Sequence, residues 1–243
     1  MTTSPPIPVP GADAAVRRLS GFAALAPGDE AFLRQVTAKA ASVPARTELV
    51  RDGDASPRPQ ILVEGWACRQ RLLADGRRQI VVMLLPGDLI GFAQRRRSLP
   101  FGSVVTLTPA QVSDAGALLR AVQACESRLA EACRQGHELE EIWLINQVVR
   151  LGRQTAYERV AHFLIELRER LAAIDRVHEN RFAFPITQEI LADALGLSVV
   201  HVNRTMQQLR RDGLIEQRAT AISLRDLPAL ISIADYVSPG RPP

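Results

Sequence analysis

The chain has 243 residues, 47% of them hydrophobic and 23% charged, and its formal net charge is +4. This length fits one or two domains with cores of their own, and the composition excludes a collagen, a disulfide-rich miniprotein and a disordered polymer. Three cysteines cannot all pair with one another, so we expect a reducing, cytoplasmic location. The sequence has no apolar run of about 18 residues that could span a membrane. The excess of basic over acidic residues favours a polyanionic partner.

Both ends of the chain are rich in proline and have little hydrophobic content. We expect residues 1–19 to be disordered and residues 238–243 to form a loose tail. The N-terminus does not resemble a secretory signal, because no basic start precedes an apolar stretch. Apolar residues spaced by three and four over residues 28–41 predict a short amphipathic helix.

Short runs rich in Val, Ile and Leu alternate with turn signals over residues 46–112. The turns are Asp52-Gly53-Asp54, Asp75-Gly76 and Pro86-Gly87-Asp88. Asp-Gly between two strand-like runs favours a hairpin, because a type I′ turn needs positive φ at both central residues. Strands this short and regularly spaced, without helices between them, predict an antiparallel β-roll or jelly-roll barrel. We assign residues 20–126 to this domain.

A helical pattern replaces the strand pattern after Ala115. We expect a helix around residues 118–122, a long helix over residues 127–151 and a third over residues 154–173. Part of the long helix has apolar residues near a 3–4 repeat, which suits packing against an identical helix, with a buried amide that can fix register. These candidate dimerisation residues are Ala132, Leu139, Ile142, Asn146 and Val149. Packing of this helix on its own barrel alone is the alternative, and the spacing does not decide between the two.

The segment from Thr187 to Gly213 has the pattern of a helix-turn-helix. Thr187 and Ser198 are N-cap candidates for two amphipathic helices, and Gly196 lies where the chain turns between them. Two short apolar runs, at residues 214–216 and 222–224, then predict a small hairpin. A helix-turn-helix followed by a hairpin is a winged helix-turn-helix, and we assign residues 153–237 to it.

The second of these helices presents a polar face that suits the major groove of DNA. Arg204 can donate two hydrogen bonds to guanine O6 and N7, and Asn203 can form the corresponding pair with adenine. Other residues are candidates for caps, apolar base contacts or phosphate contacts. The full set expected at a DNA interface is Thr187, Gln188, Ser198, Val199, Val200, His201, Asn203, Arg204, Arg210, Arg211 and Arg218. An ordinary helical hairpin with surface arginines is the alternative, and the turn, caps and hairpin together favour DNA binding.

The motifs of this region resemble the C-terminal signature of the Crp/Fnr family of bacterial transcription regulators. The matching segments are Thr187-Gln188-Glu189, Leu195-Gly196-Leu197-Ser198, Val202-Asn203-Arg204 and the run Leu209–Ile215. Turns with Gly53-Asp54, Gly65 and Gly87-Asp88 resemble the barrel of the same family, in the same order. The resemblance covers residues 20–235.

The resemblance implies an α+β fold with three parts: a cyclic-nucleotide-binding-like β-roll, a dimerisation helix over residues 127–152 with a hinge near Gly152, and a winged helix-turn-helix. It implies a homodimeric, sequence-specific transcription regulator on an inverted-repeat operator. The expected partners are double-stranded DNA, a second copy of the chain and RNA polymerase. Arg204 matches the arginine that reads guanine in this family. Val200 replaces the usual glutamate, so the family's operator does not transfer unchanged.

The resemblance does not extend to a cyclic AMP site. Family members that bind cyclic AMP have a Gly-Glu pair for the ribose, whereas Phe92 follows Gly91 here. Their Arg-Ser pair for the cyclic phosphate is also missing directly before the next strand, where the chain reads Leu99-Pro100-Phe101-Gly102-Ser103. The nearby run Arg95-Arg96-Arg97-Ser98 is basic, but a solvated loop is the favoured interpretation. We therefore expect no response to cyclic AMP, and the sequence assigns no effector.

The sequence predicts neither a metal nor a cofactor. The oxygen sensors of the family hold an iron–sulfur cluster on closely spaced N-terminal cysteines, but the first cysteine here is Cys68. Cys68, Cys125 and Cys133 are too scattered to form a metal set, so we expect buried, inert thiols, with redox sensing as the alternative. No motif marks a haem ligand around the four histidines, which are His137, His162, His178 and His201.

Catalytic motifs are also absent from the sequence. There is no phosphate-binding loop, nucleophile elbow or paired-histidine zinc helix. The Asp52–Ser56 segment resembles the start of a calcium loop, but Pro57 replaces the required glycine. Two classes without catalysis are left: the transcription regulator, and an effector-binding or protein-interaction module that uses the winged helix for docking. Arg204 and Asn203 favour the first.

Overall fold

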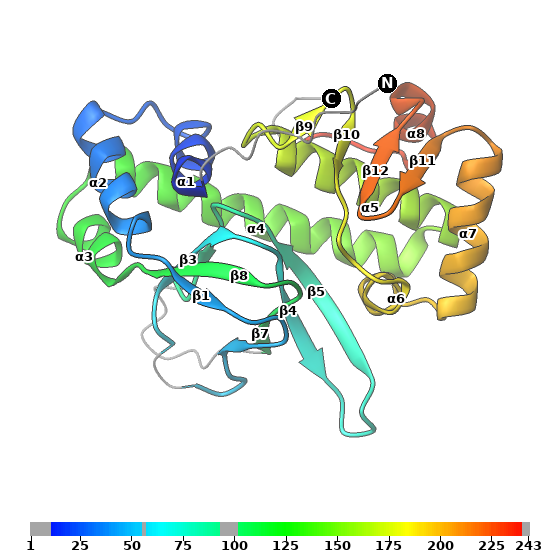
Figure 1. The fold of residues 1–243 in the computed structure, drawn as a ribbon, viewed down its shortest axis with the longest axis horizontal. Helices are drawn as coiled ribbons and strands as arrows, with labels where there is room; N and C mark the ends of the chain where they lie inside the picture. Colours follow the sequence, from blue (N-terminus) through cyan, green and yellow to red (C-terminus); the bar gives the residue numbers. More distant parts are fainter. Residues whose placement is uncertain (1–10, 55–56, 93–101, 240–243) are drawn as a thin grey trace.

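The computed structural model describes residues 11–54, 57–92 and 102–239. Two short helices, α1 (Gly11–Ser20) and α2 (Pro27–Thr37), precede a β-roll, and a long helix leads from the roll to a C-terminal helical domain with a small sheet (Figure 1). The α+β fold is therefore confirmed, and so is the helix predicted over residues 28–41, although it ends at Thr37 and a strand begins at Ala41. Across the described part of the chain, no helix is both long and apolar enough to cross a bilayer.

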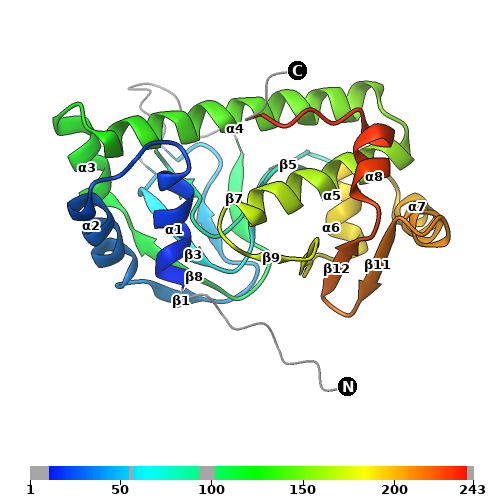
Figure 2. The same cartoon turned by 90° about the horizontal axis from the view of Figure 1, so that it is seen from above.

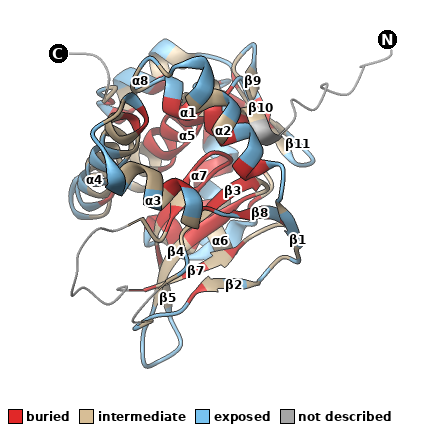
Figure 3. Cartoon of the chain, turned by 90° about the vertical axis from the view of Figure 1, so that its left-hand side faces the viewer, coloured by how far each residue is buried: buried red, intermediate tan, exposed pale blue. Residues whose placement is uncertain are grey.

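Within the described residues, the β-roll consists of two four-stranded antiparallel sheets, ordered β1-β8-β3-β6 and β2-β7-β4-β5. The strands are β1 (Ala41–Val43), β2 (Glu48–Val50), β3 (Gln60–Glu64), β4 (Ala67–Leu72), β5 (Arg78–Leu84), β6 (Leu89–Ile90), β7 (Ser103–Thr106) and β8 (Ala110–Asp114). Buried apolar side chains such as Leu62, Val82 and Val104 fill the roll. Figure 3 shows this interior in red and the tip of the β4–β5 hairpin in pale blue. The predicted roll and its hairpin are confirmed, but the turn is not type I′, because Gly76 has positive φ, 86°, and Asp75 does not.

Helix α1 belongs to the folded core. Its side chains Ala14, Ala15, Val16 and Leu19 are buried, and the helix contacts α2, β3 and the long helix. The prediction of disorder over residues 1–19 is therefore wrong for residues 11–19. The physical reason is that Ala15, Val16 and Leu19 share one helical face and pack with α2, while Ala14 packs in a second cluster. The neighbouring prolines obscure this pattern in the sequence. Residues 1–10 lie outside the described residues.

Three helices follow the roll, as predicted: α3 (Gly116–Ala124), α4 (Arg128–Arg153) and α5 (Ala156–Ala172). Helix α4 begins where Ser127 Oγ accepts a hydrogen bond from Ala130 N. Thr155 and Glu158 form a capping box at the start of α5, so each satisfies a backbone N–H of the other. In Figure 2, α4 runs along the whole molecule, beside the roll at one end and beside α5 at the other.

The C-terminal domain contains α6 (Gln188–Leu195), α7 (Val199–Arg211) and α8 (Leu227–Ala234). Its described antiparallel sheet has the order β11-β12-β10-β9. These strands are β9 (Val177–His178), β10 (Arg181–Ala183), β11 (Ile215–Arg218) and β12 (Ala221–Leu224). Strands β9 and β10 were not predicted, because runs this short and polar have no clear strand pattern. Helix α8 was not predicted either.

A buried series of charged side chains joins the roll to the helices. Asp88, in the turn between β5 and β6, lies 3.1 Å from Arg18 of α1 and 2.8 Å from Arg170 of α5. Glu166 lies 4.0 Å from Arg170 Nη1 and forms a second ion pair with Arg150 of α4. All five side chains are buried. Because charges are costly to bury, each is held by an opposite charge on a different element or a different turn.

His162 of α5 lies at the end of this series and is held neutral. Arg150 Nη2 is 3.1 Å from His162 Nδ1, and an arginine can only donate, so Nδ1 accepts and the ring proton is on Nε2. The ring of Tyr236 packs edge-on against the imidazole, with the two ring centroids 4.8 Å apart. Burial, together with the charge of Arg150, lowers the pKa of His162 from 6.5 to about 3.

We predict that this histidine makes folding stability pH-dependent between pH 6.5 and 3. In that window the unfolded chain binds a proton that the folded chain rejects, so acidification costs stability, by up to about 1.4 kcal/mol per pH unit. The free energy of unfolding, measured with urea at a series of pH values, should fall less steeply on acidification for His162→Gln than for the wild type. His178 is exposed, so His178→Gln should keep the wild-type slope. Equal slopes for wild type and His162→Gln would contradict the buried neutral ring.

Candidate nucleic-acid interface

Helices α6 and α7 are joined by the turn Gly196-Leu197-Ser198. Gly196 has φ 62° and donates its N–H to Ala192 O, which closes the C-terminus of α6. A side chain at this position would be strained by the left-handed backbone, which explains the glycine. Ser198 Oγ accepts from His201 N at 3.2 Å, and Thr187 Oγ1 accepts from Ile190 N at 3.3 Å. Both predicted N-caps are confirmed, and Thr187 and Ser198 are exposed.

Helix α7 divides into a buried face and an exposed face. Val202, Thr205, Met206 and Leu209 are buried against the rest of the domain. The opposite side carries the exposed residues Val199, Val200, His201, Arg204, Gln207, Gln208, Arg210 and Arg211. Figure 1 shows α7 at the outer edge of the molecule. The structure therefore leaves the reading face predicted from the sequence open to a partner.

The first turn of α7 is unusual in exposing two apolar side chains. Val199 is 42% exposed and Val200 is 69% exposed. Apolar groups at this position cannot hydrogen-bond to a base, but their methyls can contact the C5-methyl group of thymine. Thymine is therefore the base that these two valines suit.

Asn203 is half-buried, unlike Arg204 beside it. Its Nδ2 donates to Gln188 Oε1 at 3.2 Å, so the two residues join the start of α6 to α7. Gln188 is exposed at the beginning of its helix. The bond uses one donor of the Asn203 amide and fixes its orientation, whereas the exposed Arg204 guanidinium has no hydrogen bond or ion pair to another described residue.

The basic residues expected at phosphates lie at the end of α7 and on the wing. Arg210 and Arg211 are exposed in the last turn of α7. Arg218, at the end of β11, is also exposed and forms an ion pair with Glu216. Arg225, which was not predicted, pairs with the same carboxylate. The Glu216 carboxylate therefore partly neutralises the wing, and the cationic end of α7 is the stronger candidate for phosphate contacts.

The predicted dimerisation residues do not share one exposed face of α4. Ala132 is 0% exposed and packs in the cluster with α1 and α2, so its assignment to a seam with a partner is wrong. Leu139, Ile142 and Asn146 are half-buried. Among the described residues of α4, the exposed large apolar side chains are Ile145, Val148 and Val149, at 57%, 71% and 48%. Ile145 and Val148 were missed because the sequence pattern does not show which face the roll covers.

The cysteines occupy different environments. Burial raises the pKa of both Cys68 and Cys133 to about 12, so these thiols are protonated at neutral pH and poorly reactive. Cys125 is exposed, at the C-terminus of α3, and the expectation that it is buried is wrong. No group of three or more potential metal ligands occurs among the described residues. The basic run Arg95–Ser98 lies outside those residues.

The exposed helix α7 follows a glycine turn and is followed by a hairpin, and a long helix attaches this unit to a β-roll. This arrangement defines a winged helix-turn-helix DNA-binding protein. Residues 158–233 match the Crp-like helix-turn-helix domain. The chain is 33% identical over 204 residues to the transcriptional activatory protein AadR of Rhodopseudomonas palustris, a match that covers 83% of each chain. The chain therefore belongs to the Crp/Fnr family of transcription regulators, and the resemblance in its motifs is confirmed.

Other relatives agree with this assignment. The nitrogen fixation regulation protein FixK of Bradyrhizobium diazoefficiens is 34% identical over 169 residues, which cover 68% of this chain and 69% of that protein. The structure of FixK2 from Bradyrhizobium japonicum matches with a TM-score of 0.70 at 25% identity, over 82% of this chain and 98% of that one. A Crp/Fnr-family regulator from Thermus thermophilus shares the fold, with a TM-score of 0.63 at 20% identity, over 82% and 99% of the two chains.

Proposed function

We propose that this chain is a homodimeric, sequence-specific transcription regulator that binds an inverted-repeat operator and does not respond to cyclic AMP. The observation that carries the proposal is the exposed face of α7, which carries two valines in its first turn, Arg204 in the middle and Arg210 and Arg211 in its last turn. Arginine suits guanine and valine suits thymine, so each half-site is expected to contain a guanine flanked by thymines.

Selection of bound sequences from a random DNA pool tests this proposal. A two-fold dimer presents two reading helices, so the selected DNA is expected to be an inverted repeat with half-sites about 34 Å apart, one helical turn. If no sequence is enriched, the chain does not read DNA. That outcome would favour the second class, a module that uses its winged helix to dock another protein.

The exposed apolar residues of α4 support the proposed dimer. Ile145, Val148 and Val149 lie three and four positions apart, on one face of the helix. Apolar side chains of this size in a row suit the seam between two identical helices. We propose this face, in place of one that includes Ala132, as the contact with the second copy.

Light scattering at micromolar concentration is expected to give about twice the chain mass of 26.6 kDa. Val148→Glu is expected to give monomers, because it places a charge in an apolar seam. Val237 is 58% exposed near the C-terminus, so Val237→Glu is a matched control that should stay dimeric. A monomeric wild type would contradict the dimer.

The side chains of the β-roll support the proposal that the protein does not respond to cyclic AMP. Phe92, in place of a ribose ligand, packs on the apolar cluster that contains α1 and α2. Among the described residues of the roll, the buried polar side chains are Asp88, Thr106 and Ser113. Each is already engaged: Asp88 by two arginines, Thr106 by Pro44 O at 2.8 Å and Ser113 by Val36 O at 2.5 Å.

Calorimetric titration with cyclic AMP is therefore expected to show no binding at micromolar concentration. A Crp-type protein that binds cyclic AMP, titrated in the same buffer, serves as the positive control. Micromolar affinity combined with tighter operator binding would overturn this part of the proposal.

We also propose that the DNA-bound dimer contacts RNA polymerase at promoters. Support comes from the relative AadR, whose name describes a transcriptional activatory protein. Transcription in vitro from a promoter that carries the selected operator, with and without the protein, separates activation from repression.

A further inference from the structure

The β-roll holds the helix-turn-helix directly, at the end of α6. Arg78, the first residue of β5, donates from Nε and Nη2 to Asp193 Oδ2 at 2.8 and 2.6 Å. The two residues are 115 positions apart, and their side chains are 30% and 31% exposed. This pair connects a strand of the roll to the first helix of the DNA-binding motif.

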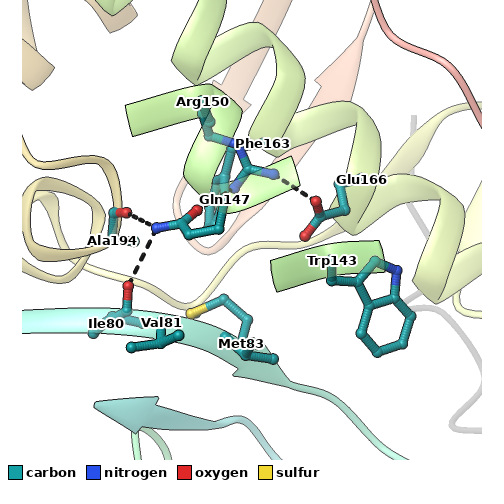
Figure 4. A pocket seen from close by; sticks show the side chains of 10 residues that line it. Ile80, Val81, Met83, Trp143, Gln147, Arg150, Phe163, Glu166 and Ala194 are labelled. Carbon is teal, nitrogen blue, oxygen red and sulfur yellow. Dashed lines mark hydrogen bonds and ion pairs between the residues drawn. The ribbon is translucent and has the colours of Figure 1, made fainter. Parts of the chain in front are cut away.

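Two glutamines bind the backbone of the same helix end. The last carbonyls of a helix have no partner within the helix. Gln79 of β5 donates from Nε2 to Asp193 O at 2.8 Å and to Ala194 O at 3.2 Å. Gln147 of α4 donates to Ala194 O at 2.6 Å and to Ile80 O at 3.3 Å. Figure 4 shows the Gln147 amide between the carbonyls of Ile80 and Ala194.

We call Arg78, Gln79, Gln147 and Asp193 the interdomain clamp. Gln147 is buried, and Arg150, one turn later, donates to its Oε1 at 2.9 Å, which fixes the orientation of the amide. The clamp therefore binds α6 to both β5 and α4 through directional hydrogen bonds, which tolerate little rotation of the helix.

Gln147 also lies in the part of α4 that carries the proposed dimer face. Ile145, Val148 and Val149 are exposed on one side of this helix, while Gln147 is buried on another. The hydrogen bond from Gln147 to α6 thus fixes the position of the helix-turn-helix relative to α4, the helix proposed to contact the second copy. Because α7 packs on α6, the clamp also relates the position of α7 to that helix.

We infer that the interdomain clamp sets the distance and angle between the two reading helices of the dimer, so that its residues are positioning residues for operator spacing. This inference rests on the proposed function. None of the four residues needs to touch a base: they act through α6 on α7. Their loss should therefore change which spacing of half-sites is bound, while each half-site is still read.

The test compares full-length variants on three kinds of DNA: the selected operator, the same operator with the spacer lengthened or shortened by a base pair, and a single half-site. Arg78→Glu and Asp193→Arg each break the ion pair, and Gln147→Met removes the donor at similar volume. Each is expected to bind the selected operator roughly tenfold more weakly, as loss of one coupled interaction predicts. Each is also expected to discriminate less between spacings, with unchanged half-site binding.

The double variant Arg78→Glu/Asp193→Arg restores an ion pair with the charges exchanged, so it is expected to recover spacing discrimination. Arg77 is the matched control, because it is exposed and pairs with Asp75 in the hairpin. Arg77→Glu makes the same charge change as Arg78→Glu and should bind every DNA as the wild type does. Thermal unfolding of each variant separates lost positioning from lost fold.

Two outcomes would overturn the inference. One is wild-type spacing discrimination in folded Arg78→Glu and Asp193→Arg proteins. The other is an equal loss on the half-site and on the operator, which would make these residues part of DNA reading itself. A wild type that selects no DNA sequence is a different result, because it removes the proposed function before the clamp is tested.

Discussion

Arg204→Ala is expected to weaken binding to the selected operator and to remove the preference for guanine at one position of each half-site. The guanidinium is exposed on the reading face of α7, and its two parallel donors match guanine O6 and N7. The expected loss is roughly 1–3 kcal/mol per half-site. Affinities of both proteins for the operator, and for one with the guanine changed, give the measurement.

Arg211→Ala serves as the comparison, because it removes the same charge from an exposed position at the end of the same helix. A phosphate contact carries no sequence information, so this variant should lose affinity for all sequences about equally and show a weaker salt dependence. If wild type and Arg204→Ala lose equal affinity when the guanine is changed, Arg204 does not read that base.

Asp88→Asn is expected to lower the free energy of unfolding by about 3–5 kcal/mol, the cost of removing one partner from a buried ion pair. Asp88 is the shared partner of Arg18 and Arg170, and all three side chains are buried. Asparagine keeps the shape and can still accept from Leu85 N, which Asp88 Oδ2 does at 2.7 Å. The loss therefore reports the charge rather than the turn.

Urea unfolding of the wild type and of Asp88→Asn at neutral pH measures this loss of stability. Asp75→Asn is the control, because Asp75 pairs with Arg77 at the exposed tip of the hairpin. That variant should unfold as the wild type does. An Asp88→Asn protein as stable as the control would mean that the two arginines find sufficient acceptors in Pro86 O, Met83 O and Glu166.

The sequence predicted the elements that local chemistry determines. Asp75-Gly76 turns between β4 and β5, and Thr187 and Ser198 begin the two helices of the DNA-binding motif. These features depend on residues within a few positions of one another, so a single chain shows them. Helix α1 and strands β9 and β10 depend instead on burial against distant elements, and the local pattern did not reveal them.

The surfaces of α4 show the same limit. The sequence places apolar side chains around much of this helix, and only the folded roll determines which of them are covered. Trp143, Gln147 and Arg150 are buried, which leaves Ile145 and Val148 outside. The interdomain clamp could not be predicted for a similar reason, because Arg78 and Asp193 meet only after both domains have folded.

The buried charges have a consequence for how the protein loses its structure. Arg18 on α1, Asp88 in the roll and Arg170 on α5 depend on one another, although they lie in the N-terminal helix, the β-roll and the C-terminal half. If the turn that carries Asp88 unfolds, Arg18 and Arg170 both lose their shared counter-ion, and if α1 or α5 unfolds, Asp88 loses one of its two. Partial unfolding is therefore penalised, and the two halves behave as one cooperative unit. Deleting residues 1–20 would remove Arg18, and with it one of the two counter-ions of Asp88, so it would destabilise the contact with α5 although Arg18 is far from the reading helix.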